Sequence, residues 1–116
     1  HALALPVPGA TIEVAVDEGL RIDDVDQAGA LLRCAQEGIT NALRHGRAGR
    51  ITVALRRNGD HVELTVDNDG AAPLAMREGN GLTGMRERLQ ACGGTLAILP
   101  TPPRGMRLVA RVPGAA

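Results

Sequence analysis

The stretch from Gly79 to Gly84 reads GNGLTG, which is the G-x-G-x-x-G spacing of the dinucleotide-binding fingerprint. That fingerprint needs a strand directly before its first glycine and an acidic residue about 20 positions after it. Here the preceding residues are PLAMRE, which is not a β-branched run, and the region from Pro100 to Arg104 contains no acidic residue. NAD binding is therefore not predicted, and the glycines need another explanation.

The glycines lie at the start of a predicted helix, which covers Leu82 to Ala91 and ends at Gly93-Gly94. Backbone N–H groups at a helix start lie at the positive end of the helix dipole, so they can bind phosphate groups. A glycine-rich loop that only bends the chain is the alternative interpretation. This stretch alone does not decide between the two.

Around this helix the sequence predicts strands that come mostly in adjacent pairs. A longer helix is expected from Asp26 to Gly46, with Asp24 or Asp26 as its N-cap and Gly46 as its end. Asn58-Gly59-Asp60 is a strong hairpin signal between two of the strands. The expected strands cover residues 11–16, 51–56, 61–67, 95–99 and 106–112.

This order predicts the fold class and the extent of the domain. Adjacent pairs of strands indicate an α/β two-layer sandwich, in which a mixed, mostly antiparallel sheet carries both helices on one face. A chain of 116 residues is long enough for one domain with a single core and too short for two. We expect residues 11–116 to form that domain and residues 1–10, HALALPVPGA, to be a connector or an expression remnant.

The composition argues against several functions. Thirteen acidic residues balance 13 basic ones, so a global attraction to nucleic acid or to a membrane is not supported. All the basic residues are arginine, which excludes a Walker-type P-loop because that loop needs a lysine. The absence of Phe, Tyr and Trp argues against base stacking on single strands. No apolar run approaches a membrane span, and the two cysteines, which lack metal-ligand spacing, are expected to be thiols in a reducing cytoplasm.

The longer helix carries a polar stripe opposite an apolar arc. At about 100° per residue, one arc contains Ala28, Leu31, Leu32, Ala35, Ile39, Ala42 and Leu43. The opposite arc contains Glu37, Thr40, Asn41 and Arg44. An ordinary solvated face is the alternative, but Asn and Thr are poor choices for one, and Gly38 costs about 1 kcal/mol relative to Ala inside a helix. A functional face would explain both features.

The chemistry of this stripe suits a phosphate compound. Glu37 could polarise a hydroxyl group or accept its proton. The amide oxygen of Asn41 is a suitable hard ligand for Mg²⁺, which binds few protein groups and keeps phosphate oxygens and water. Arg44, His45 and Arg47 could approach phosphates, although a basic helix end that faces the dipole is the alternative.

Three stretches in order resemble the motifs of bacterial sensor histidine kinases. EGITNALRHG (37–46) resembles their N box, VDNDG (66–70) their first glycine box, and GNGLTGMRERL (79–89) their second, in the form of the NarL/DesK-type subfamily. The resemblance covers residues from about 11 to 112. It implies the Bergerat-type ATP-binding fold, which is shared with gyrase, the heat-shock chaperone family and mismatch-repair ATPases.

The resemblance also implies roles for individual residues. Glu37 matches the glutamate that assists phosphoryl transfer, Asn41 matches the asparagine that holds Mg²⁺ on the phosphates, and Arg44 and His45 match positions near the phosphates. Ala71 to Gly79 would be the ATP lid, and the lid glycines would place N–H groups on the phosphates. The implied nucleotide-binding residues are Asn41, Asn68, Asp69, Gly70, Gly79, Gly81, Leu82, Thr83 and Gly84.

Two positions depart from the family pattern. The first glycine box follows D-x-G-x-G, which places Asn68 at the adenine-reading position and Ala72 at the second glycine. An Asn oxygen can still accept a hydrogen bond from the adenine amino group, but it lacks the charge that strengthens such a bond. Weaker binding or altered base selectivity is therefore a hypothesis, and Asp69 or Asp67 is an alternative adenine contact.

No histidine of the chain stands in the context of a phosphoacceptor. His1 is terminal, His45 lies in the N box, and His61 opens a predicted strand. The chain is therefore expected to be an isolated, monomeric catalytic and ATP-binding domain that does not phosphorylate itself. Its expected partners are the dimerisation helices of a parent kinase and, indirectly, a response regulator, with no nucleic acid or direct membrane contact. We expect a cytoplasmic location, with any membrane anchor in the parent protein.

Two other functions stay open at this point. A serine kinase that acts on anti-sigma antagonists has the same fold, although the wording NGLTGMRERL argues against it. The other is a module that has lost phosphoryl transfer and signals through nucleotide-dependent contacts, and the departures at Asn68 and Ala72 keep this alternative open. Phosphate transfer to a supplied dimerisation helix would separate that module from a kinase.

Overall fold

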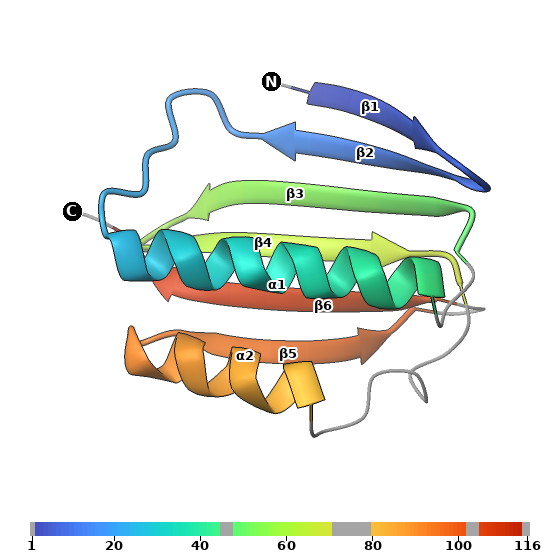
Figure 1. Cartoon of the computed structure of the whole chain (residues 1–116). Helices are drawn as coiled ribbons and strands as arrows, with labels where there is room; N and C mark the ends of the chain where they lie inside the picture. The colour runs from blue at the N-terminus through green and yellow to red at the C-terminus, as the bar shows by residue number, and fades with distance from the viewer. Residues whose placement is uncertain (1, 45–47, 71–79, 102–104, 115–116) are drawn as a thin grey trace.

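The computed structural model describes residues 2–44, 48–70, 80–101 and 105–114 as one sheet of six strands and two helices. In chain order, the elements are β1 (Ala2–Val7), β2 (Ala10–Val16), α1 (Val25–Arg44), β3 (Arg50–Asn58), β4 (His61–Asn68), α2 (Asn80–Ala91), β5 (Thr95–Pro100) and β6 (Met106–Pro113). The strands lie in the order β1-β2-β3-β4-β6-β5. Only β2 and β3 are parallel neighbours among these pairs, and both helices cover one face of the sheet (Figure 1). The predicted mixed two-layer sandwich is confirmed.

The first strand corrects the expectation for the start of the chain. Residues 2–7, which we expected to be part of a connector, form β1 and pair antiparallel with β2. The turn between the two strands contains Gly9 at φ +79°, a left-handed conformation that glycine adopts without strain. The segment ALALPV has no polar alternation and contains Pro6, so its own pattern does not predict a strand. An edge position tolerates proline, and pairing with β2 supplies what the local pattern lacks.

Asp24 caps helix α1, as one of the two predicted alternatives. Its Oδ1 accepts hydrogen bonds from the backbone N–H groups of Asp26 at 2.9 Å and Gln27 at 3.1 Å. These bonds satisfy two donors that a helix start otherwise leaves without a partner. The predicted end at Gly46 lies outside the described residues.

The buried side of α1 is rotated relative to the predicted apolar arc. Leu32 is 60% exposed and Leu43 is 37% exposed, although both were expected to face the core. Cys34 and Gly38 are buried in their place. Hydrophobicity alone does not predict that Cys34 and Gly38 are buried, because neither adds much apolar area. Cys34 and Gly38 are buried because α1 lies close to the sheet, where small side chains fit.

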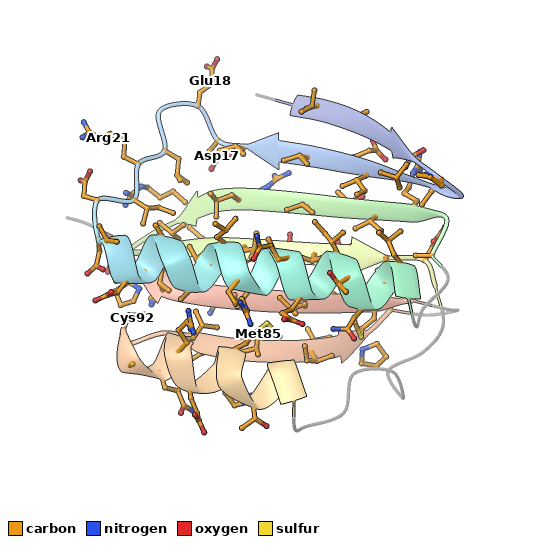
Figure 2. The ribbon with its side chains drawn as sticks, viewed as in Figure 1. Asp17, Glu18, Arg21, Met85 and Cys92 are labelled. Atoms are coloured by element: carbon orange, nitrogen blue, oxygen red, sulfur yellow. The ribbon has the colours of Figure 1, made fainter. Side chains whose placement is uncertain are left out.

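Helix α2 begins earlier than predicted and ends where predicted. It starts at Asn80 instead of Leu82, and Gly93 follows its end at φ +78°. The N–H of Gly94 donates to the Leu89 carbonyl at 2.7 Å, which closes the helix end. Met85 and Leu89 are buried against the sheet, and Figure 2 shows the side chain of Met85 between the helices.

Candidate nucleotide-binding site

Three of the predicted motifs lie at one end of the helix layer. Helix α1 runs alongside β4 in the same direction, and α2 starts at the end where both of them finish (Figure 1). The last turns of α1, the end of β4 and the first turn of α2 therefore share one region of the molecule. Cys92 lies at the opposite end of α2 (Figure 2), so this thiol is remote from that region.

Gly38 sets how closely α1 approaches β4. A Cβ atom built on Gly38 would lie 3.1 to 3.3 Å from three side-chain carbons of Val66. That is tighter than ordinary van der Waals contact, so a side chain at this position would require Val66 or α1 to shift by a few tenths of an ångström. The sequence suggests Gly38 as a mark of a functional face, and in the structure this glycine has a packing role against Val66. This packing places Glu37 and Asn41 on the part of α1 that lies beside the end of β4.

The side chains of Glu37 and Asn41 are half-buried on the last turns of α1. The Asn41 Nδ2 group donates to the Glu37 carbonyl at 2.9 Å, which directs the amide nitrogen back onto the helix. Since nitrogen is used in this way, Oδ1 is the atom that points away from that bond and can coordinate a cation. The Glu37 carboxylate lies 3.6 Å from Arg33 Nε, in an i,i+4 ion pair on the exposed side of the helix.

Asn68 is the buried polar side chain of the described residues, with 7% of its surface exposed. It ends β4 on the same face as Val66, because side chains alternate along a strand, and that face carries the helices. Its Oδ1 accepts a hydrogen bond from the Gly70 N–H at 2.8 Å. An amide oxygen has two lone pairs, so Oδ1 can accept a second hydrogen bond from a ligand.

Asp67 is not a second candidate for the adenine contact. It faces the open side of the sheet, where Arg107 donates to its two carboxylate oxygens at 2.6 and 3.2 Å. This pairing raises the pKa of Arg107, chiefly through the hydrogen bond with the Asp67 carboxylate. The alternation that turns Asn68 toward the helices turns Asp67 away from them. The structure therefore contradicts the alternative at Asp67.

Asp69 makes backbone contacts that the sequence did not indicate. Its Oδ1 accepts from the N–H groups of Gly49 at 2.8 Å and Arg50 at 3.0 Å. These partners lie 20 and 19 residues away along the chain, so no local spacing could have predicted them. Asp69 thus joins the end of β4 to the residues that follow α1.

The second glycine box lies partly outside the described residues. Gly79 and the lid from Ala71 belong to the undescribed part of the chain, as does His45. Gly81, Leu82, Thr83 and Gly84 lie in the first turns of α2, where the side chain of Thr83 is half-buried. The first turn of α2 contains no acidic residue, so no carboxylate there competes for the positive end of its dipole. Arg44 ends α1, and its side chain is not described.

The donor chemistry of the site fits Mg²⁺ better than a tightly held metal. Within residues 2–44, 48–70, 80–101 and 105–114, no group of three or more His, Cys, Asp or Glu side chains could hold a metal ion. Mg²⁺ does not need such a cage, because it uses one or two protein oxygens and completes its shell with phosphate oxygens and water. The Oδ1 of Asn41 could be one such oxygen, at the same end of the helix layer as the start of α2, which suits phosphates.

Comparison with known proteins decides the family. Residues 26–116 match the sequence profile of the histidine kinase-, DNA gyrase B- and HSP90-like ATPases. The chain belongs to this family. The match contains the predicted N box and both glycine boxes, and it agrees with the Bergerat-type fold that the resemblance implied. The NarL/DesK-type subfamily stays a prediction.

Individual relatives agree with this family. The chain is 35% identical over 103 residues to the signal transduction histidine-protein kinase/phosphatase UhpB of Salmonella typhimurium, covering 87% of this chain and 19% of UhpB. The histidine kinase domain of the Erythrobacter litoralis EL346 blue-light activated histidine kinase has a TM-score of 0.70 at 27% identity, over 88% of this chain and 51% of that one. The ATP binding domain of PrrB from Mycobacterium tuberculosis has a TM-score of 0.64 at 27% identity, over 97% and 78%.

The chain spans about a fifth of the length of curated relatives that it matches. Their other regions have no counterpart in these 116 residues. Among the described residues, neither helix has the length and apolar character needed to cross a membrane.

Proposed function

We propose that this chain binds Mg-ATP and donates the γ-phosphoryl group to a histidine on a dimerisation helix of a parent sensor histidine kinase. The family consists of ATPases, and the relatives UhpB and YxjM are named as histidine kinases. The main support for this proposal is that three sequence motifs lie close together in the fold. The N box on α1, the glycine box at the end of β4 and the start of α2 lie at one end of the helix layer (Figure 1).

Each part of the nucleotide has a matching group in this arrangement. The Oδ1 of Asn41 would hold Mg²⁺ against the phosphates, and Mg²⁺ would neutralise phosphate charge there. The N–H groups at the start of α2 would bind phosphate oxygens. Asn68 would contact adenine with its remaining acceptor site or its Nδ2 group. Arg44, His45, Gly79, Gly81, Leu82, Thr83 and Gly84 are proposed to line the phosphate side of the pocket.

Glu37 is the proposed catalytic residue. The transfer forms a bond between phosphorus and the acceptor imidazole nitrogen and breaks the bond between the γ-phosphorus and the oxygen of ADP. The attacking imidazole nitrogen uses its lone pair, so the ring proton is on the other nitrogen. A carboxylate can accept a hydrogen bond from that N–H and take its proton as the ring becomes positively charged. Glu37 is half-buried one helical turn from Asn41, which puts its carboxylate near the proposed metal ligand.

Calorimetric titration tests the nucleotide part of this proposal. ATP is titrated into the chain with and without Mg²⁺, and GTP and NAD are titrated in parallel. Binding of ATP that requires Mg²⁺, with none for NAD, is the expected result. A folded chain, judged by circular dichroism, that binds no ATP would contradict the proposal.

A second experiment tests phosphoryl transfer. A dimerisation helix pair from a related kinase, with its histidine, is supplied with the chain and γ-labelled ATP. Label on that histidine, lost in a Glu37→Gln variant that still binds ATP, is expected. ATP binding without transfer to any supplied helix would favour a module that signals through nucleotide-dependent contacts. The observation that favours this second function is Asn68, whose neutral oxygen is already bonded to Gly70.

The proposed setting follows from the proposed activity. The partners are the dimerisation and phosphoacceptor helices of the parent kinase and, through them, a response regulator. The domain is expected to act in the cytoplasm, where ATP is present, and the parent is expected to carry any membrane anchor.

A further inference from the structure

We infer that Asp69 is a positioning residue of the nucleotide site, not a ligand of the nucleotide. The inference rests on the function proposed above. Asp69 follows directly after the proposed adenine contact, Asn68, and its carboxylate binds the backbone that follows α1. It thereby fixes the distance between the adenine end of the site and the metal end.

The evidence is the set of hydrogen bonds around one carboxylate oxygen. Oδ1 of Asp69 accepts from Gly49 N at 2.8 Å and from Arg50 N at 3.0 Å. The N–H of Asp69 donates in return to the Arg50 carbonyl at 3.3 Å. Bonds from N–H groups to a carboxylate are stronger than those between neutral groups. Asp69 therefore holds the backbone at residues 49 and 50 through both its side chain and its main chain.

The clamped segment continues to the proposed metal ligand. The N–H of Ala48 donates to the carbonyl of Ala42 at 3.1 Å, and Ala42 is the neighbour of Asn41. On the other side, the Gly49 carbonyl accepts from the N–H of Thr11 at 3.0 Å, which ties the same segment to β2. A chain of backbone contacts thus runs from Asp69 to the last turn of α1. If Asp69 releases residues 49 and 50, the last turn of α1 loses its fixed position relative to Asn68.

The alternative is that Asp69 contacts adenine itself, which the sequence left open. The geometry argues against it, because the oxygen that binds two backbone N–H groups is directed at Gly49 and Arg50. The two readings make different predictions for the Asp69→Asn variant. Asparagine keeps an oxygen at Oδ1 and can preserve the clamp, but it removes the charge that a direct contact would use.

The test compares Asp69→Ala, Asp69→Asn and a matched control, Asp67→Asn, in the full chain. Asp67 lies on the same strand end but faces the open side, so its variant removes a charge at a similar place without touching the clamp. ATP affinity with Mg²⁺ is measured by calorimetry. Hydrogen exchange of the Gly49 and Arg50 amides is measured by NMR, and folding is checked by circular dichroism.

For Asp69→Ala we expect faster hydrogen exchange at the Gly49 and Arg50 amides. We also expect a loss of ATP affinity of about tenfold, which is the size of effect seen when a residue that orients a metal ligand is removed. Asp69→Asn and Asp67→Asn should keep affinity within about threefold. Equal losses in the Asn and Ala variants, with the two amides unaffected, would overturn the inference in favour of direct contact. Wild-type affinity in a folded Asp69→Ala chain would also overturn it. Absence of ATP binding by the wild type would instead overturn the proposed function.

If Asp69→Ala does not fold, the exchange and affinity measurements on Asp69→Asn alone test the inference. Slow exchange of the Gly49 and Arg50 amides, with retained ATP affinity, supports the clamp. Fast exchange of these amides with unchanged ATP affinity would show that the clamp does not position the site, and it would overturn the inference.

Discussion

Gly38 of α1 lies directly against Val66 of β4, so close that a methyl group at Gly38 would meet three carbons of the valine at 3.1 to 3.3 Å. Val66 is buried and surrounded by core residues, so it has little room to move. Asn68 lies two residues after Val66, and Asn41 lies three residues after Gly38. This contact therefore sets the spacing between the two sides of the proposed site.

Gly38→Ala is expected to destabilise the chain by about 1–2 kcal/mol, because overpacking costs more than the gain in helix propensity. It should also weaken ATP binding by moving α1 away from β4. Gly29→Ala is the matched control, since a Cβ at Gly29 in the same helix meets nothing within 4 Å. That variant should gain up to about 1 kcal/mol. Urea unfolding followed by circular dichroism measures both, and equal effects of the two substitutions would contradict this account.

Asn41→Ala is expected to abolish the Mg²⁺-dependent part of ATP binding without destabilising the fold. The side chain contributes one hydrogen bond to its own helix, and alanine has the higher helix propensity. Calorimetry with and without Mg²⁺ checks the prediction. Thr40→Ala, on the exposed neighbouring position, serves as the control. Unchanged Mg²⁺ dependence in Asn41→Ala would remove this residue from the metal site.

Asn68→Asp is expected to tighten ATP binding by roughly threefold to tenfold. Aspartate has the same shape, can still accept the Gly70 N–H, and offers a charged acceptor to the adenine amino group. The cost is the burial of a carboxylate, which should lower the free energy of unfolding. Titrations with ATP and GTP measure affinity and selectivity. Weaker ATP binding by a folded Asn68→Asp chain would show that the neutral amide is the better partner at this position.

The free energy of unfolding should fall as the pH rises from 9 toward 11. Burial raises the pKa of the Cys34 thiol from 9.0 to about 11, although Arg88 lowers it in part. The unfolded chain therefore ionises this thiol first, and stability that is fully present below pH 9 is lost as the pH approaches the folded value. The slope should reach about 1.4 kcal/mol per pH unit.

This chain suits such a test because it has no Lys and no Tyr, whose ionisation would overlap with that of the thiol. Urea unfolding is followed by circular dichroism at several pH values between 8 and 11. Cys34→Ala should be less stable at pH 8 and have a much flatter profile. An equally steep profile in Cys34→Ala would mean that other groups, such as Cys92, dominate.

Much of the fold could be predicted from local patterns. The alternation in TIEVAV, the hairpin signal at Asn58-Gly59-Asp60 and the glycines after α2 predicted their elements within a few residues. These features depend on neighbours in the chain, and so they are visible without the structure. β1 was missed because an edge strand that contains Pro6 forms through pairing with β2.

The sequence predicted which residues belong to the candidate site better than it predicted how their side chains are directed. The motifs around Asn41, Asn68 and Gly81 depend on residue type and spacing, which the sequence contains in full. The direction of Asp67, away from the helices, depends on which face of the sheet the helices cover. Sequence spacing does not specify that face, so the alternative at Asp67 could be rejected only from the structure.

By itself the sequence determined the order of the elements after β1, the family motifs and the absence of a P-loop lysine and of stacking aromatic residues. Only the tertiary structure decided that Gly38 serves the contact with Val66 and that Asp69 binds the backbone at Gly49 and Arg50. The physical reason is the separation along the sequence of the residues that interact. Helix caps, turns and alternation arise from residues a few positions apart, whereas close packing and long-range hydrogen bonds depend on which surfaces meet after the chain has folded.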